Sequence, residues 1–175
     1  MTREVLYHGK VFDLIVDKVL YPSGTSGIRE IAHHPGGAVV VPLLPDGGVI
    51  MVEQLRYPLG RRLLELPAGK LAPGEDPAAA AGRELTEETG WIAGRLRKLT
   101  SIHTTPGFCD EELHLFLGTE LRESPAGHRR EEGELTMTVR VIPLHESIAM
   151  IERGEITDGK SVAGLLLADR MRSRA

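Results

Sequence analysis

The sequence predicts a mixed α/β protein of the α+β type, and three observations predict it. Segments with the alternation or the apolar runs of β-strands fill most of the first 56 residues and return between residues 96 and 142. A helix with clear start and stop signals lies between these strand regions, and two further helical segments follow Pro143. The chain of 175 residues is long enough for a sizeable core and suits one main domain.

Residues 1–36 form an N-terminal strand region, expected to be antiparallel and distinct from a main domain at residues 37–175. Residues 11–20 alternate loosely, and a turn rich in proline and glycine separates them from a second alternating segment at residues 28–34. Long exposed strands need a partner or a cover. The pattern leaves two arrangements open: a homodimer formed through these strands, or strands that join the main sheet.

The main domain is expected to begin with the continuous apolar run at residues 38–44. The sequence PDGG at residues 45–48 is a strong turn signal, which predicts that residues 49–56 return as the hairpin partner of that run. Later strands are expected at residues 96–103, 112–121 and 135–142. A polar, charged loop at residues 124–134 precedes the last of them.

The helix at residues 77–89 has the strongest local signals. Asp76 suits the N-cap, Pro77 suits the first helical position, and Gly90 suits the position after the last turn. Two C-terminal helices are expected at residues 144–153 and 159–172.

Composition and charge argue against several functional classes. The hydrophobic share of 41% and the charged share of 26% are ordinary for a globular protein. The formal net charge of −4 argues against a nucleic-acid partner, which would normally require a basic face. No apolar run approaches the roughly 20 residues of a membrane span, and no signal-peptide core is present, so we expect a cytoplasmic protein without a membrane partner. The single cysteine, Cys109, excludes an intrachain disulfide.

Three glutamates crowd the end of the best-defined helix. Glu84 and Glu88 lie one turn apart on one side, and Glu87 lies beside them. Like charges at this spacing destabilise a free helix by roughly a few tenths of a kcal/mol. One explanation is a solvated face on which Arg83 offsets Glu87. The other is a divalent cation, because Mg²⁺ prefers oxygen ligands and would relieve the repulsion.

The loop before these glutamates favours the cation. Residues 69–91, GKLAPGEDPAAAAGRELTEETGW, resemble the Nudix box at each of its fixed positions. These positions are Gly69, Glu75, Arg83, Glu84, Leu85, Glu87, Glu88, Gly90 and Trp91. Agreement over so many fixed spacings is far more specific than a short glycine motif. The chain is therefore identified as a member of the Nudix hydrolase superfamily, whose fold has a mixed β-sheet sandwiched between helices.

The resemblance to the Nudix family implies roles for individual residues. Glu84 and Glu88 match the main metal ligands, Glu87 matches a further or water-mediated ligand, and the carbonyl of Ala68 matches a backbone ligand. Arg83 matches the arginine that orients the glutamates, and Arg83 and Glu87 are counted with the catalytic residues. The implied metal is Mg²⁺, with Mn²⁺ as the alternative.

Segments outside the box resemble the ADP-ribose pyrophosphatase subfamily. Residues 104–112, TTPGFCDEE, look like the segment that follows the box in those enzymes, and residues 64–69, LELPAG, look like the segment that leads into it. Residues 29–36 resemble a strand near the adenine side, often contributed by the partner subunit. Each segment alone could be an ordinary turn or exposed strand, and their joint order carries the resemblance. The implied substrate-binding residues are Arg29, Glu30, Arg56, Glu65, Gly107 and Phe108.

The charged loop at residues 124–134 holds the candidate catalytic base. In the ADP-ribose subfamily a mobile acidic loop at this place supplies a glutamate, which Glu131 or Glu132 matches best. Glu134 is a third candidate, close to the following strand. Ordinary solvated loop charge is the alternative.

The resemblance thus implies a homodimer that hydrolyses a small-molecule substrate, ADP-ribose, to AMP and ribose 5-phosphate. One alternative is a Nudix pyrophosphatase for another sugar nucleotide, such as GDP-mannose, or for a broad range of ADP-sugars. A second is a module that binds ADP-ribose without cutting it, which the complete set of box glutamates argues against.

Overall fold

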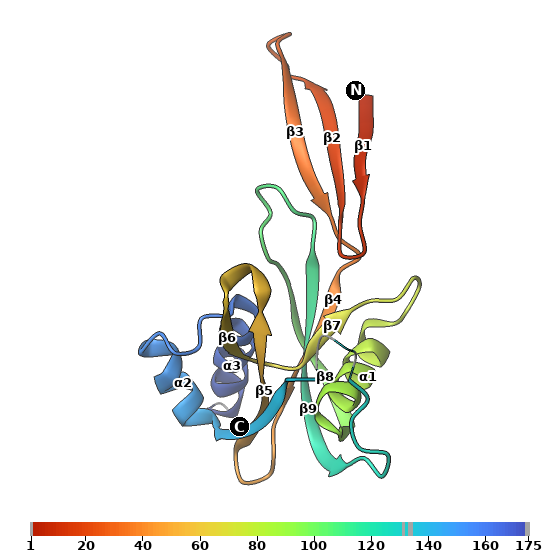
Figure 1. Ribbon diagram of the computed structural model, residues 1–175. Helices are drawn as coiled ribbons and strands as arrows, with labels where there is room; N and C mark the ends of the chain where they lie inside the picture. The colour runs from red at the N-terminus through yellow and green to blue at the C-terminus, as the bar shows by residue number, and fades with distance from the viewer. Residues whose placement is uncertain (1, 131, 133–134, 174–175) are drawn as a thin grey trace.

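The computed structural model describes residues 2–130, 132 and 135–173, and a mixed sheet lies at the centre of its main body (Figure 1). The strand order in this sheet is β7 (Ala68–Lys70), β4 (Gly37–Pro42), β9 (Glu112–Glu123) and β8 (Trp91–His103). β4 and β9 run parallel, and the other neighbouring strands run antiparallel.

Helices cover both faces of the mixed sheet. On one face, α1 (Pro77–Thr89) shares a core cluster with Val40 of β4. On the other, α3 (Gly159–Arg172) shares the larger core cluster with the alternate residues Val39 and Val41. The prediction of a mixed sheet between helices is confirmed. No helix in the described part of the chain is long and apolar enough to cross a membrane.

The local signals around α1 act as predicted. The Asp76 carboxylate accepts hydrogen bonds from the backbone N–H groups of Ala78 and Ala79, both at 3.0 Å. Pro77 opens the helix, and Gly90 closes it with a φ of 78°, in the left-handed region that glycine tolerates. The helix therefore begins and ends where the sequence places it.

A second, antiparallel sheet has the order β10 (Thr138–Pro143), β5 (Gly48–Arg56) and β6 (Arg61–Glu65). The short helix η1 (Tyr57–Leu59) joins β5 to β6, and α2 (Leu144–Glu152) follows β10 directly. The edge strand β6 and the three-residue strand β7 are absent from the sequence prediction.

The prediction that residues 49–56 pair with residues 38–44 is wrong. The turn forms, since the N–H of Gly47 donates to the carbonyl of Leu44 at 3.0 Å, and an isolated bridge joins Leu43 to Val49. Beyond this bridge the two strands enter different sheets. Both are buried along most of their length, and each takes neighbours on both edges from segments later in the chain.

The N-terminal strands form a third sheet, which stands away from the main body in Figure 1. It consists of β1 (Thr2–His8), β2 (Asp13–Leu20) and β3 (Ser26–His33), all antiparallel. The end of β3 is hydrogen-bonded to the main body, because the N–H of Ala32 donates to the carbonyl of Phe108 at 2.8 Å. Strand β1 is a further element that the sequence pattern did not predict.

Candidate functional site

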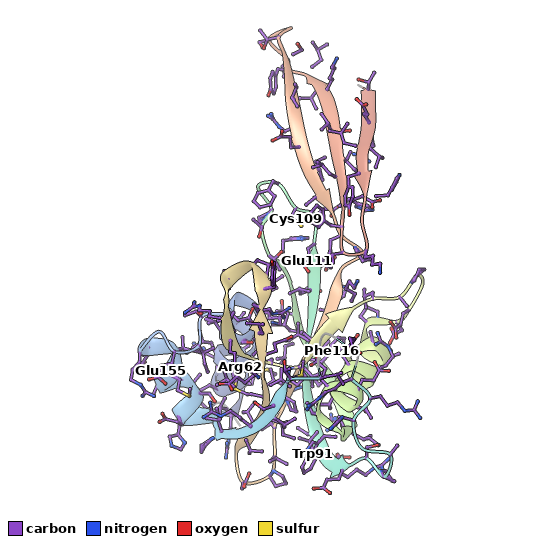
Figure 2. The ribbon with its side chains drawn as sticks, viewed as in Figure 1. Arg62, Trp91, Cys109, Glu111, Phe116 and Glu155 are labelled. Atoms are coloured by element: carbon purple, nitrogen blue, oxygen red, sulfur yellow. The ribbon has the colours of Figure 1, made fainter. Side chains whose placement is uncertain are left out.

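A pocket of about 790 Å³ opens where the mixed sheet, the β5–β6 hairpin and the N-terminus of α3 meet. Its wall includes Ala68 and Gly69 of β7, Arg56 of β5 and Lys160 of α3. The loop that precedes β9 contributes Glu111, which Figure 2 shows below Cys109 where the loop enters the strand. This volume is sufficient for a small-molecule ligand.

The backbone at Ala68 and Gly69 lies against two carboxylates of α1. The N–H of Ala68 donates to Oε2 of Glu88 at 3.1 Å. The carboxylate of Glu84 lies directly over the Cα of Gly69, so that a methyl group at this position would overlap it. The one-turn spacing of Glu84 and Glu88 on α1 brings both onto this backbone segment. Glycine at position 69 is therefore required by close approach.

Arg83 holds the acidic cluster together. Its guanidinium donates to Glu75 at 2.9 and 3.0 Å, to Glu84 at 2.7 Å and to Glu87 at 2.9 Å. The hydrogen bonds from Arg83 lower the pKa of Glu75 to about 2, and the same contact raises the pKa of Arg83. The repulsion expected among the glutamates is thus offset by one arginine that contacts three carboxylates.

The proposed metal donors are all oxygens, which suits Mg²⁺. Within the described residues, no group of three or more His, Cys, Asp or Glu side chains has the geometry of a metal site. The predicted ligand set is of another kind, with the carboxylate of Glu88 at the N–H of Ala68 and that of Glu84 over Gly69. Mg²⁺ commonly takes one or two protein carboxylates and completes its shell with water and phosphate oxygens. These residues therefore fit a metal ion that is shared with a phosphate ligand.

A second charged group consists of Glu65 with Arg56 and Lys160, and its two cations line the pocket. The Glu65 side chain has 0% exposed surface and accepts hydrogen bonds from Arg56 at 2.7 and 2.6 Å and from Nζ of Lys160 at 2.5 Å. Burial alone would raise the pKa of Glu65, but the hydrogen bonds from Arg56 and the charge of Lys160 outweigh burial and lower it. As it lies, Glu65 can act on a ligand only through these two cations.

Sequence reasoning missed Lys160. Its side chain is 10% exposed, and Nζ also donates to Asp158 at 2.8 Å. A signal was available, since a lysine in the first turn of a helix opposes the helix dipole and calls for another reason to be there. The reason is Glu65, which lies 95 residues away in sequence.

The loop before β9 contributes to the pocket residues other than those predicted to bind the substrate. Thr104 donates to Glu111 at 2.6 Å, and both line the pocket, as does His34, whose Nδ1 lies 3.3 Å from Glu111. Phe108 is 60% exposed, and neither Phe108 nor Gly107 is among the pocket residues.

Arg29 and Glu30 do not line the pocket of their own chain. Both lie on β3 in the N-terminal sheet, where the guanidinium of Arg29 packs over the ring of Tyr21 at 5.4 Å. Their assignment to the substrate stays a prediction that requires a second chain.

The loop that holds the candidate base is anchored to the end of α1. The N–H of Arg129 donates to the carbonyl of Glu87 at 2.8 Å, and Nε of Arg130 donates to the carbonyl of Glu88 at 2.9 Å. Glu132 is exposed, whereas Glu131 and Glu134 lie outside the described residues.

The chain is similar to several known proteins. The family model described as NUDIX domain matches residues 33–165. The chain is 41% identical to the ADP-ribose pyrophosphatase of Bacillus subtilis, over 92% of this chain and 86% of the relative. It is 40% identical to the methanol dehydrogenase activator of Bacillus methanolicus, over 91% and 85% of the two chains. The GDP-mannose pyrophosphatase of Yersinia enterocolitica is 32% identical over 89% of this chain and 83% of its own.

A solved structure shares the fold. It is described as an ADP compounds hydrolase and superimposes with a TM-score of 0.86, covering 99% of this chain and 93% of its own. The two sequences are 18% identical, so the likeness concerns the fold alone.

Proposed function

The chain belongs to the NUDIX family, and from this premise we propose that it hydrolyses the pyrophosphate of a nucleoside diphosphate-sugar. The proposed substrate is ADP-ribose, cut to AMP and ribose 5-phosphate. One observation carries the proposal: Glu88 accepts from the N–H of Ala68 and Glu84 lies over Gly69, at a backbone segment that lines the same pocket as Arg56. The name of the Bacillus subtilis relative supports the choice of substrate. The expected compartment is the cytoplasm.

The metal would be held by Glu84, Glu88 and the carbonyl of Ala68, with Glu87 as a further or water-mediated ligand. Mg²⁺ is the proposed ion and Mn²⁺ the alternative. When bound, such an ion neutralises phosphate charge and lowers the pKa of a coordinated water. Arg83 fixes the orientation of Glu84 and Glu87 through the hydrogen bonds described above.

A glutamate of the loop at residues 131–134 would accept the proton of the attacking water. The anchoring of Arg129 and Arg130 to the last turn of α1 supports this assignment, because these two residues precede the loop and lie beside the helix that carries Glu84 and Glu88. Arg56, supported by Glu65, would contact the diphosphate as a bidentate cation.

The N-terminal sheet supports a homodimer. Large apolar side chains of residues 1–36 are exposed in the single chain, among them Leu6, Tyr7, Phe12 and Ile28. A sheet with so much exposed apolar surface needs a cover. A second copy would supply it, and would bring its own Arg29 and Glu30 to the pocket.

Mixing two inactive variants tests this arrangement. Arg29→Ala removes the residue expected from the partner, and Glu84→Gln removes a metal ligand. If the sheet of one protomer serves the pocket of the other, dimers formed by exchange contain one intact pocket and recover activity. Failure to recover activity in exchanged dimers would contradict the shared site.

GDP-mannose is the second candidate substrate, since a relative with 32% identity is named for it. Product release from ADP-ribose, ADP-glucose and GDP-mannose, each with Mg²⁺, ranks the candidates. We expect ADP-ribose to have the highest kcat/KM, and EDTA or Glu84→Gln to abolish turnover while the far-ultraviolet circular dichroism stays unchanged. Wild-type activity in Glu84→Gln would defeat the metal assignment.

A further inference from the structure

The first turn of α3 is hydrogen-bonded to residues 65 and 66, which precede β7. The hydroxyl of Ser161 accepts a hydrogen bond from the N–H of Leu66 at 2.7 Å, and Nζ of Lys160 donates to the neighbouring Glu65 at 2.5 Å. Ser161, Leu66 and Glu65 all have 0% exposed surface. Two consecutive residues of one segment are thus bound by two consecutive residues of another, 95 positions away.

The direction of these hydrogen bonds is fixed. The Asp158 carboxylate can only accept, and it takes hydrogen bonds from the N–H and the hydroxyl of Ser161 and from Nζ of Lys160. The Ser161 hydroxyl therefore donates to Asp158 and presents a lone pair to Leu66. A threonine at position 161 could do the same, whereas an alanine would leave the N–H of Leu66 buried without this acceptor.

Tight packing holds α3 against the same segment. A methyl group on Gly164, one turn after Ser161, would meet the side chains of Leu66 and Val41. Glycine at this position lets the helix approach closely enough for the Ser161 hydroxyl to reach the backbone.

The segment after Leu66 has little freedom. Pro67 fixes its own φ, and its carbonyl accepts from the N–H of Val40 at 3.0 Å. Ala68 follows at once and donates to Glu88 at 3.1 Å. A shift of Leu66 is therefore transmitted through a stiff link to the backbone at Ala68.

We propose that Ser161 is a positioning residue for the metal site, acting through Leu66 and Pro67 to hold the backbone of Ala68 against Glu88 and that of Gly69 against Glu84. The inference rests on the proposed function, since it assumes that these residues bind a divalent cation. Ser161 contacts neither the metal nor the substrate.

The test compares Ser161→Ala with Ser161→Thr and with a matched control, Ser147→Ala. Ser147 is also 0% exposed and donates its hydroxyl to the carbonyl of Pro143 at 3.2 Å, at the start of α2. Binding of Mn²⁺ alone is measured by electron paramagnetic resonance of the free ion. Thermal unfolding without metal, and kcat and KM for ADP-ribose with Mg²⁺, are measured on the same proteins.

We expect Ser161→Ala to bind Mn²⁺ about tenfold more weakly, the effect of losing a residue that supports a metal ligand. Its kcat should fall with KM nearly unchanged, and Ser161→Thr should restore both affinity and kcat. Ser147→Ala should lower the unfolding temperature and leave Mn²⁺ affinity as in the wild type. Wild-type Mn²⁺ affinity in Ser161→Ala, or an equal loss in Ser147→Ala, overturns the inference alone. A wild type that binds no Mn²⁺ overturns the proposed function as well.

Discussion

Replacing Glu65 with glutamine should destabilise the fold strongly, because this one buried carboxylate is paired with two cations. It has no exposed surface, and it accepts two hydrogen bonds from Arg56 and one from Lys160. Glutamine keeps the shape of the side chain, but it removes the charge and turns one acceptor oxygen into a donor amide that faces other donors.

The size of the effect follows from burial. Breaking a buried ion pair by removing one partner costs about 3–5 kcal/mol. The Arg56 side chain is 43% exposed and can regain water, so the lower value applies, about 3 kcal/mol. In a chain of this size, each kcal/mol lowers the unfolding temperature by about 2–4 °C, which gives an expected fall of about 6–12 °C.

Thermal unfolding at pH 7, followed by circular dichroism, measures this fall. Glu155→Gln is the matched control, because Glu155 pairs with Arg153 at 2.6 Å on the surface, where such pairs contribute little. The pKa of Glu65 is lowered in the fold, so its contribution is present above the ordinary value of 4.5 and lost as the pH falls below it. The difference in unfolding temperature between Glu65→Gln and the wild type should therefore become smaller as the pH falls. Equal unfolding temperatures for Glu65→Gln and Glu155→Gln at pH 7 would show that Glu65 stabilises the fold no more than a surface carboxylate does.

Three further predictions concern the loop before α1 and the candidate catalytic base. Gly69→Ala should lower kcat about 100-fold by displacing the Glu84 carboxylate, while Gly82→Ala on the same helix, where the added methyl meets only ordinary contact, keeps wild-type turnover. In Glu75→Gln the free energy of unfolding should fall less steeply with decreasing pH than in the wild type, since the pKa of Glu75 is about 2 and the stabilisation by its carboxylate is lost between about pH 4.5 and 2. Parallel plots of unfolding free energy against pH for the two proteins would contradict this. Replacing Glu131 or Glu132 with glutamine should cut kcat at least about 100-fold at constant KM; if neither does, and Glu134→Gln is also normal, the base lies elsewhere.

Local signals in the sequence predicted the parts of the fold that depend on neighbouring residues. The bounds of α1 follow from Asp76, Pro77 and Gly90, whose effects reach only a few residues along the chain. The pairing of β5 could not be predicted in this way. A turn between two apolar runs favours a hairpin, whereas burial on both sides favours partners from distant segments, and here burial decides.

In the candidate site too, some residues are identified by local sequence patterns and others only by the fold. The glutamates of α1 and the glycine of the loop are identified by fixed spacing within 23 residues, from Gly69 to Trp91. Lys160 reaches the pocket through a contact with a residue 95 positions away, and Glu111, which belongs to the segment at residues 104–112, lies in the pocket beside the distant His34. For Glu65 the structure adds two cationic partners, Arg56 and Lys160, which the sequence pattern did not predict.

Hydrolysis of ADP-ribose in ¹⁸O-labelled water with Mg²⁺ is the decisive experiment for the proposed reaction. We expect AMP and ribose 5-phosphate in equal amounts, with one labelled oxygen in the phosphate that was attacked. Intact ADP-ribose after incubation with enzyme that binds Mn²⁺, or cleavage of GDP-mannose in its place, would show that ADP-ribose is not the substrate.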